Sequence, residues 1–507
     1  MKIADIKLVL VAACLAALAA VTSAEQITFS ENIAAIVHDK CSSCHRPGQS
    51  APFSLLTYEQ VSERADTIAA VLDDGYMPPW KNVVPDVAFQ HDRRLAKSEY
   101  ELIKKWVAAG APQGDPSRTP QIPKFSKDWQ LGRPDLIVEM NGQYPVPADG
   151  PDIHRSFVFP VNLPSDKWVK AIEIKSQARS TLHHALFFVD AARAGREEDG
   201  KDGRAGITGM GFLGRSALVG ARKRDSGPPS ISLGGYVPGT TPMLLPGDNA
   251  MLLPKGADVI MQTHFHPSGK PETEHVTMAL YFADRPPSRR LASIMIPPLF
   301  GRFAGLDIPA GDANHTMTDS FRIPVDVKAI RVASHAHYLG KEMDMTAQLP
   351  NGKTVRLLQI ADWEFDWQDT YQFAAPVDLP AGTVLHAKVV HDNSKANFSN
   401  PNSPPKRVAW GTESFDEMGS VTLQVVATHA KDQDRLHEAV RAKLRDAVTQ
   451  SFRSRVQQPG EQSLSGPMFK RLDKNGDGAL DETELEAAPG PLKVLLQGYK
   501  RRRGDRR

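Results

Sequence analysis

The feature that most constrains this chain is one short motif, Cys41-Ser42-Ser43-Cys44-His45. A C-x-x-C-H motif supplies two thiols for attachment of haem and a histidine to bind the iron. The chain has three cysteines, and the third, Cys14, lies in an apolar N-terminal run. The motif therefore predicts covalent haem c with His45 as the proximal ligand. The alternatives are a redox dithiol and a zinc site, although a zinc site would need further ligands and no other cysteine is at hand to supply them.

An export signal precedes this motif. A basic N-terminus leads into an apolar run from Leu8 to Val21, and Thr22-Ser23-Ala24 then forms a small-residue cleavage site. The run is too short to predict a membrane span. We therefore expect residues 1–24 to be a signal peptide, and the protein to be exported, periplasmic or extracellular, without a transmembrane segment. A loose lipobox ending at Cys14 keeps a lipid anchor open as an alternative.

Residues 25–115 are rich in helical and polar patterns, and they resemble class I cytochrome c over residues 28–112. The sixth iron ligand in such small domains is often a methionine. Met77 is the candidate, because the prolines that follow it stiffen its loop. The alternative for Met77 is an ordinary core position. Residues 116–127 are rich in Pro, Ser and Gln and predict a linker.

From residue 128 to about 430, short apolar strands alternate with turns, which is the pattern of all-β domains. The length favours two sandwiches, 128–285 and 286–430, joined near Arg285-Pro286-Pro287. A helical linker is expected over 431–460. The net charge of +2 gives no indication of nucleic-acid binding. The basic tail 491–507 is interpreted as a solvated terminus.

Three histidine clusters stand in the β region: His183-His184, His264-Phe265-His266 and His335-Ala336-His337. Imidazole suits copper, zinc and iron. On a strand, residues two apart face the same side, so His335 and His337 can reach one metal. His183 and His184 would point to opposite faces of a regular strand. They could share a metal at a strand end or through different ring nitrogens.

Four motifs resemble those of the copper type II, ascorbate-dependent monooxygenases, the family of peptidylglycine alpha-hydroxylating and dopamine beta-monooxygenases. They occur in the family's order. The motifs are Ser180–Leu186 with the double histidine, Met261–His266, Ser334–Gly340 with H-x-H, and Ser414–Met418.

The resemblance implies two mononuclear coppers, one in each of two jelly-roll-like sandwiches. The electron-transfer copper would be bound by His183, His184 and His264, with His266 as a competing third ligand. The oxygen-activating copper would be bound by His335, His337 and Met418, whose soft thioether favours Cu(I).

This sequence departs from the family in the region that holds a peptide carboxylate in the amidating enzyme. Ala333, Ser420 and Thr422 stand where that enzyme has an arginine and other polar residues, which argues against a peptide substrate that ends in glycine. The aromatic stretch 363–367 either lines a pocket for an apolar substrate or belongs to a core strand.

A calcium loop is expected in residues 461–490, where the spacing matches an EF-hand and its central glycine, Gly478, allows the sharp turn. The expected ligands of one calcium ion are Asp473, Asn475, Asp477, Ala479, Asp481 and Glu484. The alternative is an acidic surface turn.

The expected fold class is therefore a small all-α cytochrome c domain, two all-β jelly-roll-like sandwiches and a short helical EF-hand tail. The expected function is a copper monooxygenase that hydroxylates a C–H bond of a small organic substrate with dioxygen. Electrons would come through its own haem from an external donor, either ascorbate or a redox protein. The alternatives are an electron-transfer or copper-handling haem protein without oxygenase turnover, and a binding or sensor module.

Overall fold

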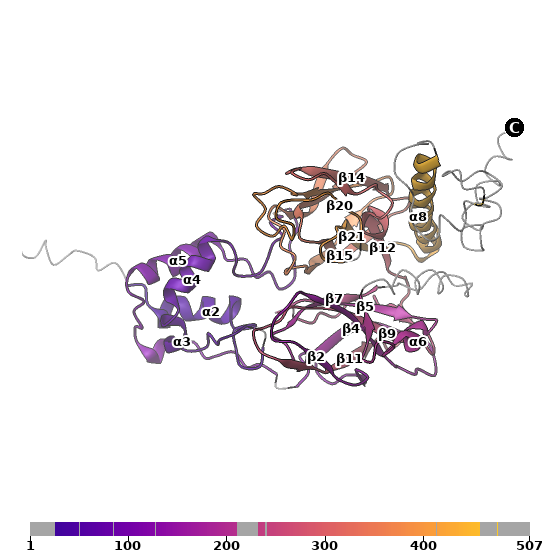
Figure 1. Cartoon of the computed structure of the whole chain (residues 1–507). Coiled ribbons are helices and arrows are strands. Elements are labelled where there is room, and N and C mark those ends of the chain that lie inside the picture. Colours follow the sequence, from indigo (N-terminus) through magenta and orange to yellow (C-terminus); the bar gives the residue numbers. More distant parts are fainter. Residues whose placement is uncertain are drawn as a thin grey trace, which may run out of the picture. The chain divides into compact units, whose positions relative to one another are not determined.

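The computed structural model describes residues 26–456 except 50, 85, 127, 210–231, 239–240 and 412, and also residue 474. The chain divides into two compact units (Figure 1). The first comprises Met1–Pro78 and Arg93–Lys124, and the second comprises Pro79–Asp92 and Phe125–Arg507. Within the part of the chain that the structure describes, no helix is long and apolar enough to cross a bilayer.

The first unit is built from short helices around the buried side chains of Phe29, Ile33, Ile103 and Trp106. Thr57 begins one helix with a capping box shared with Gln60, which satisfies backbone donors at the helix start. The helices are η1 (Phe29–Ile33), α2 (Ala34–Lys40), α3 (Tyr58–Ser62), α4 (Ala65–Asp73), α5 (Lys97–Ala108) and η2 (Pro116–Arg118).

The first half of the second unit has two main sheets. The β5–β9 sheet has the order β6-β3-β9-β5-β7, and the β4–β11 sheet has the order β1-β11-β4-β8. The strands of the first are β6 (Ile207–Thr208), β3 (Ile153–Phe159), β9 (Asp258–Phe265), β5 (Leu182–Asp190) and β7 (Ser232–Tyr236). Those of the second are β1 (Leu136–Glu139), β11 (Val276–Phe282), β4 (Lys167–Ser176) and β8 (Met251–Leu253). One apolar core, including Phe157, Met261 and Met278, joins the two sheets.

The second half of this unit also has two main sheets. The β15–β21 sheet has the order β12-β21-β15-β18, and the β16–β19 sheet has the order β14-β19-β16-β17. The strands of the first are β12 (Ala292–Ile296), β21 (Gly419–Ala427), β15 (Val327–Ala336) and β18 (Thr370–Leu379). Those of the second are β14 (His315–Arg322), β19 (Val384–His391), β16 (Gly340–Gln348) and β17 (Thr354–Ile360). A second core, including Leu423, Val389 and Met345, lies between them.

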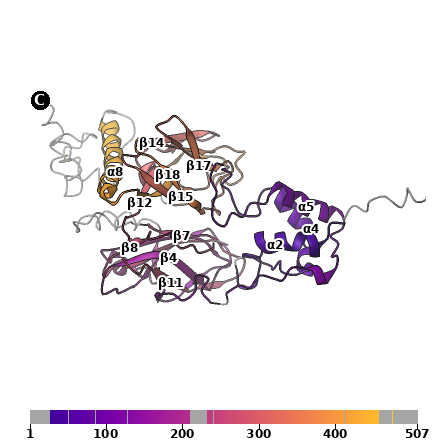
Figure 2. The ribbon, with the colours of Figure 1, turned by 180° about the vertical axis from the view of Figure 1, so that it is seen from behind.

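Smaller elements complete the second unit. The helix α8 (Gln433–Val456) lies beside β12 in both views (Figures 1 and 2), and its Leu436 is buried in the second core. The remaining elements are β2 (Tyr144–Val146) with β10 (Glu272–Glu274), β13 (Asp307–Ile308) with β20 (Val408–Ala409), α6 (Ala194–Glu198), η3 (Pro298–Gly301), η4 (Ala430–Asp432) and α8 (Gln433–Val456).

The segment Pro79–Asp92 lies between two helices in the sequence but belongs to the β unit. Asn82 forms a bridge with Ile360, and Phe89 forms one with Phe373. The Lys81 ammonium lies 2.7 Å from Glu364 and 3.1 Å from Asp362. Backbone pairing, ring packing and ion pairs therefore fix this segment to the second half of the β unit.

The expected fold class is wrong. Of the described residues, 34% lie in strands and 18% in helices, so strands predominate. The described residues of 25–115 do not form a separate all-α cytochrome domain, because the helices are few and short and Pro79–Asp92 leaves them for the β unit. In place of two matched jelly-roll-like sandwiches, the β region has main sheets of five, four, four and four strands with two two-stranded sheets beside them. The expected EF-hand tail lies outside the described residues apart from Lys474.

Candidate metal centres

The first candidate centre lies on the outer face of the β5–β9 sheet. Along β9, Val259 and Met261 enter the core, so strand alternation turns His264 to the opposite face. His264 pairs in register with His184 on β5 and with His154 on β3. Three histidines therefore form one row across three adjacent strands.

His184 and His264 direct nitrogen atoms at each other. Their Nδ1 atoms are 3.4 Å apart, and both side chains are buried. Two nitrogens bound tetrahedrally to one metal at 2.0–2.1 Å lie about 3.3 Å apart, so this spacing fits a shared metal ion. Burial and the neighbouring imidazoles lower the pKa of His184 well below its usual value, which keeps the ring neutral. Neutral imidazole is the form that binds metal.

A β-bulge explains how two adjacent histidines reach the same region. The register of β5 and β9 pairs Leu182 with Phe265 and then His184 with His264, so His183 is an extra residue. The ring of His183 lies 5.2 Å from that of His264, and its Nδ1 lies 2.8 Å from Asp366. The bulge thus brings His183 and His184, which a regular strand would point to opposite faces, near His264.

Asp152 sets which nitrogen of His264 carries the proton. Its Oδ2 lies 2.8 Å from His264 Nε2 and also accepts from the Tyr338 hydroxyl. Burial alone would raise the pKa of Asp152, but its contacts with His264, Tyr338 and His266 hold that pKa well below its usual value. An ionised carboxylate only accepts, so Asp152 favours the tautomer of His264 with the proton on Nε2 and with Nδ1 directed toward His184.

The competing ligand His266 lies beyond the end of β9. Its side chain is 57% exposed, and its Nδ1 lies 2.8 Å from Asp152. His264 is fully buried within the histidine row. The geometry therefore favours His264 over His266 as the third ligand of this centre.

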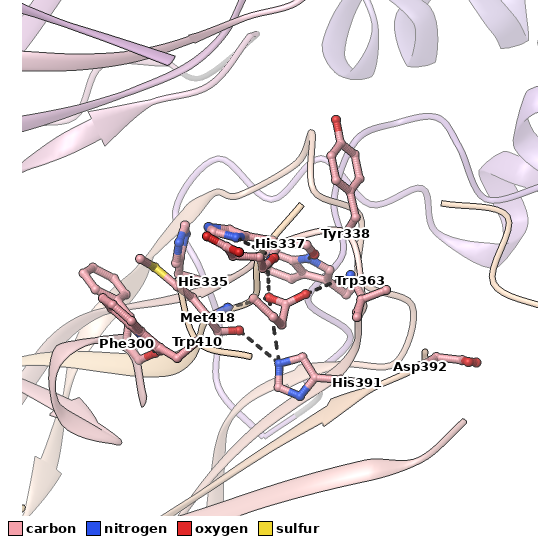
Figure 3. Close-up of polar contacts among 12 residues, drawn as sticks. Phe300, His335, His337, Tyr338, Trp363, His391, Asp392, Trp410 and Met418 are labelled. Carbon is pink, nitrogen blue, oxygen red and sulfur yellow. Dashed lines mark hydrogen bonds and ion pairs between the residues drawn. The ribbon is translucent and has the colours of Figure 1, made fainter. Parts of the chain in front are cut away.

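The second candidate centre lies where β15 ends and β21 begins. The rings of His335 and His337 are 5.3 Å apart at 89°. Met418 is buried and directly precedes β21, whose first residue, Gly419, pairs with Ala336. Figure 3 shows these side chains together with Trp363 and His391. The structure therefore brings the H-x-H motif and the methionine motif to one sheet edge.

The buried carboxyl of Glu417 holds this edge together. It accepts hydrogen bonds from the backbone N–H groups of His337 at 2.5 Å, Met418 at 2.7 Å and Leu339 at 2.9 Å. Burial raises the pKa of Glu417 to about 8. Sequence reasoning did not single out Glu417, although it stands directly before the methionine. Its three bonds fix the backbone of the two motifs relative to each other.

The histidines of the second centre are also neutral and oriented. Burial lowers the pKa of His335 to about 4 and that of His337 well below its usual value. His335 Nδ1 faces the Gln368 carbonyl, and His337 Nδ1 lies 3.1 Å from the Asp416 carbonyl oxygen. A nitrogen that faces a carbonyl oxygen carries the proton, so each ring leaves Nε2 free.

Aromatic rings enclose the two centres. Phe300 packs at 4.9 Å from His335 and has a left-handed backbone, with φ of 54°. Such a conformation costs a non-glycine residue free energy and is typical of functional sites. Phe365 lies between the centres, 5.0 Å from His264 and 5.6 Å from His337.

The side chains at the two centres have the donor types that copper prefers, but they are not arranged as a complete set of metal ligands. Within the described ranges, no three His, Cys, Asp or Glu side chains already converge on one point as metal ligands. His184 and His264 form a convergent pair, and His183, His335 and His337 each keep Nε2 free. Imidazole and thioether donors of this kind fit copper.

Sequence reasoning missed His154 and Asp152. His154 stacks on His264 at 4.7 Å, and its buried Nε2 has no hydrogen-bond partner. A single histidine on a strand carries no motif, and its place beside His264 depends on the register of β3 and β9. No signal in the sequence separates it from an ordinary strand residue.

The haem motif follows helix α2 in the first unit. Cys41 caps this helix, and the N–H groups of Cys44 and His45 both donate to the Cys41 carbonyl, which places all three on one turn. Both thiols are free, and burial with the nearby Cys44 raises the pKa of Cys41 to about 12. His45 Nδ1 lies 3.2 Å from the Phe53 carbonyl oxygen, and Nε2 takes no part in that contact.

Two other predictions are less constrained. The backbone N–H of Met77 donates to the Val71 carbonyl after helix α4, and its role as an iron ligand stays a prediction. The calcium ligands Asp473, Asn475, Asp477, Ala479, Asp481 and Glu484 lie outside the described residues.

No family model and no curated protein matches this sequence. Among solved structures, the major capsid protein P2 of bacteriophage PM2 matches with 11% identity and a TM-score of 0.22, over 58% of this chain and 97% of that one. Peptide-N(4)-(N-acetyl-beta-D-glucosaminyl) asparagine amidase matches with 10% identity and a TM-score of 0.25, over 58% and 97%. These TM-scores are too low to support any conclusion about fold or function.

Proposed function

We propose that this chain is an exported, copper-dependent monooxygenase that hydroxylates a C–H bond of a small organic substrate. The observation that carries the proposal is the pair of neighbouring centres, one with His184 and His264 nitrogens 3.4 Å apart and one with His335 and His337 beside Met418. The resemblance of four motifs to the copper type II monooxygenases points to the same chemistry.

Bound copper would supply dioxygen activation at one centre and one-electron transfer at the other. Residues of the chain orient the candidate ligands at both centres. Asp152 keeps the proton of His264 on Nε2, and Glu417 holds His337 beside Met418. The overall reaction consumes substrate, dioxygen, two electrons and two protons, and yields the alcohol and water.

A polar face beside His335 is the proposed lining for substrate. One face of the β15–β21 sheet enters the core, and the other carries His335 opposite Ser420 and Ala333 opposite Thr422. The hydroxyl of Ser420 is buried without a hydrogen-bond partner. A buried hydroxyl without a partner loses free energy, so a substrate that hydrogen-bonds to it would gain affinity.

The haem motif provides the proposed entry for electrons. Cys41 and Cys44 lie on one turn with His45, whose Nε2 is free, and this arrangement suits covalent haem c. The proposed external donor is ascorbate or a redox protein, and one calcium ion is proposed for the loop from Asp473 to Glu484.

The test is the metal content and oxygen uptake of the whole protein exported from a host that attaches haem c. We expect about one haem and about two copper ions per chain, and oxygen uptake that depends on substrate. His264→Ala should lower the copper content by about one ion, whereas His266→Ala should leave it unchanged. Copper without substrate-dependent oxygen uptake across a broad screen would instead support an electron-transfer or copper-handling protein. Protein that takes up no copper rules out the proposal.

A further inference from the structure

The loop between β17 and β18 contacts both candidate centres. Asp366 lies 2.8 Å from Nδ1 of His183, in the first centre. The Gln368 side-chain carbonyl accepts from Nδ1 of His335, in the second centre. The Trp363 indole N–H donates to the His337 carbonyl oxygen at 3.1 Å (Figure 3). Residues 363–368, called here the bridging loop, thus place a polar side chain beside a histidine of each centre.

The ring of Phe365 lies between the two centres. Its centroid is 5.0 Å from that of His264, 5.6 Å from that of His184 and 5.6 Å from that of His337. Its side chain is buried. One aromatic ring therefore contacts histidines that come from different halves of the β unit.

The bridging loop is itself held in place. Its Glu364 pairs with Lys81 at 2.7 Å, and the Gln368 amide N–H donates to the Phe365 carbonyl at 2.9 Å. The latter bond leaves the Gln368 oxygen facing His335. A Cβ on Gly340 would lie 2.4 Å from the Trp363 ring, so glycine is required there for the indole to pack.

We infer that the bridging loop is a positioning element that orients both centres at once, Asp366 acting on His183 and Gln368 acting on His335. Each acceptor holds the ring proton on Nδ1, so that each imidazole presents Nε2 to its metal. Phe365 couples the spacing of the two centres. The inference rests on the proposed function for the identity of the metal, but the tautomers it assigns are properties of the metal-free protein.

The first test reads the tautomers directly, by long-range ¹H–¹⁵N correlation of histidine rings in metal-free, full-length protein. We expect the Nδ1–H form for His183 and His335. Asp366→Ala should shift His183 and leave His335 unchanged, and Gln368→Ala should do the reverse. Asp366→Asn keeps a carbonyl acceptor and should restore the His183 signal. Unchanged tautomers in both alanine variants would overturn the inference.

The second test measures Cu(I) affinity at each centre by competition with a chromophoric chelator. Asp366→Ala should weaken the first centre and Gln368→Ala the second, each by about 10- to 100-fold, and Phe365→Ala should weaken both. The matched control is Asp362→Ala, because Asp362 is 79% exposed and pairs with Lys81, which keeps Glu364.

The two tests separate this inference from the proposed function. If the tautomers shift as expected but the protein binds no copper, the positioning role of the bridging loop is supported and the proposed copper monooxygenase function is ruled out. If the wild type, Asp366→Ala and Gln368→Ala all bind copper with equal affinity, the positioning role is contradicted and the proposed copper centres are still supported.

Discussion

Two carboxylates, the fully buried Glu417 and the partly buried Asp152, each contact several groups in the two centres. Asp152 contacts His264, His266 and Tyr338, and Glu417 accepts from three backbone N–H groups around the H-x-H turn. A buried acceptor that serves several donors stabilises the structure most through what its removal would leave unpaired. These two residues therefore connect the stability of the β unit to the geometry of its histidines.

Replacing Glu417 tests this connection. Glu417→Ala would leave the N–H groups of His337, Met418 and Leu339 without their acceptor, and each unsatisfied donor costs about 1–3 kcal/mol. We expect the free energy of unfolding to fall by about 3 kcal/mol or more, measured by urea unfolding. The control is Glu342→Ala, which removes a half-exposed pair with Lys388 and should cost less than about 1 kcal/mol. Equal losses in the two variants would contradict the role of Glu417.

Among the elements, α8 is fixed to the β unit through one face. Leu436 enters the core beside β12, and Arg290 contacts Gln433 and Asp434 at the helix start. His437 lies on the same part of the helix. Burial, Arg290 and Arg441 lower its pKa to about 4. The folded protein therefore holds this imidazole neutral where the unfolded chain protonates it.

The depressed pKa of His437 predicts acid sensitivity of the helix. Between about pH 4 and the unfolded value near 6.5, the unfolded chain binds more protons than the folded one, so stability falls as the pH falls through this window. His437→Gln should reduce the loss by on the order of 1 kcal/mol, after allowance for partial exposure. Urea unfolding at pH 4.5 and pH 7 measures it, with exposed His429→Gln as control. An unchanged pH dependence in His437→Gln would show that other groups cause the loss.

At the scale of the whole molecule, the chain leaves its helical unit and returns to it. Pro79–Asp92 adds Lys81, Trp80 and Phe89 to the second β half, with Trp80 and Phe89 packed around Tyr371. Lys81 is 8% exposed and pairs with Glu364 and Asp362. The segment Pro79–Asp92 therefore holds the bridging loop in place, although it lies far from that loop in the sequence.

Lys81→Ala should destabilise the β unit. Its partners reach water, so we expect a loss of about 1–2 kcal/mol rather than the larger cost of breaking a fully buried pair. For a unit of this size, the loss should lower the melting temperature by about 1–2 °C per kcal/mol. Lys328→Ala, which removes an exposed pair with Asp378, should leave the melting temperature nearly unchanged. Calorimetry distinguishes the variants, and no difference between them would contradict a structural role for the excursion.

The sequence predicted only those parts of the candidate site that depend on residues close together in the chain. The cysteines and histidine of the haem motif are adjacent in the chain, so one helical turn brings them together. Alternation along β9 likewise places His264 on one face. The predicted fold class was wrong. Local periodicity does not show which unit a segment joins, and Pro79–Asp92 joins the β unit although helices flank it in the sequence.

The sequence by itself determined the motif residues, their order and the chemistry of their side chains. The tertiary structure alone decided that His154 lies beside His264, that a bulge turns His183 toward Asp366, and that Asp152 lies beside Nε2 of His264. These contacts join residues far apart in the chain. Strand register and packing bring such residues together, and neither is encoded in any short stretch of sequence.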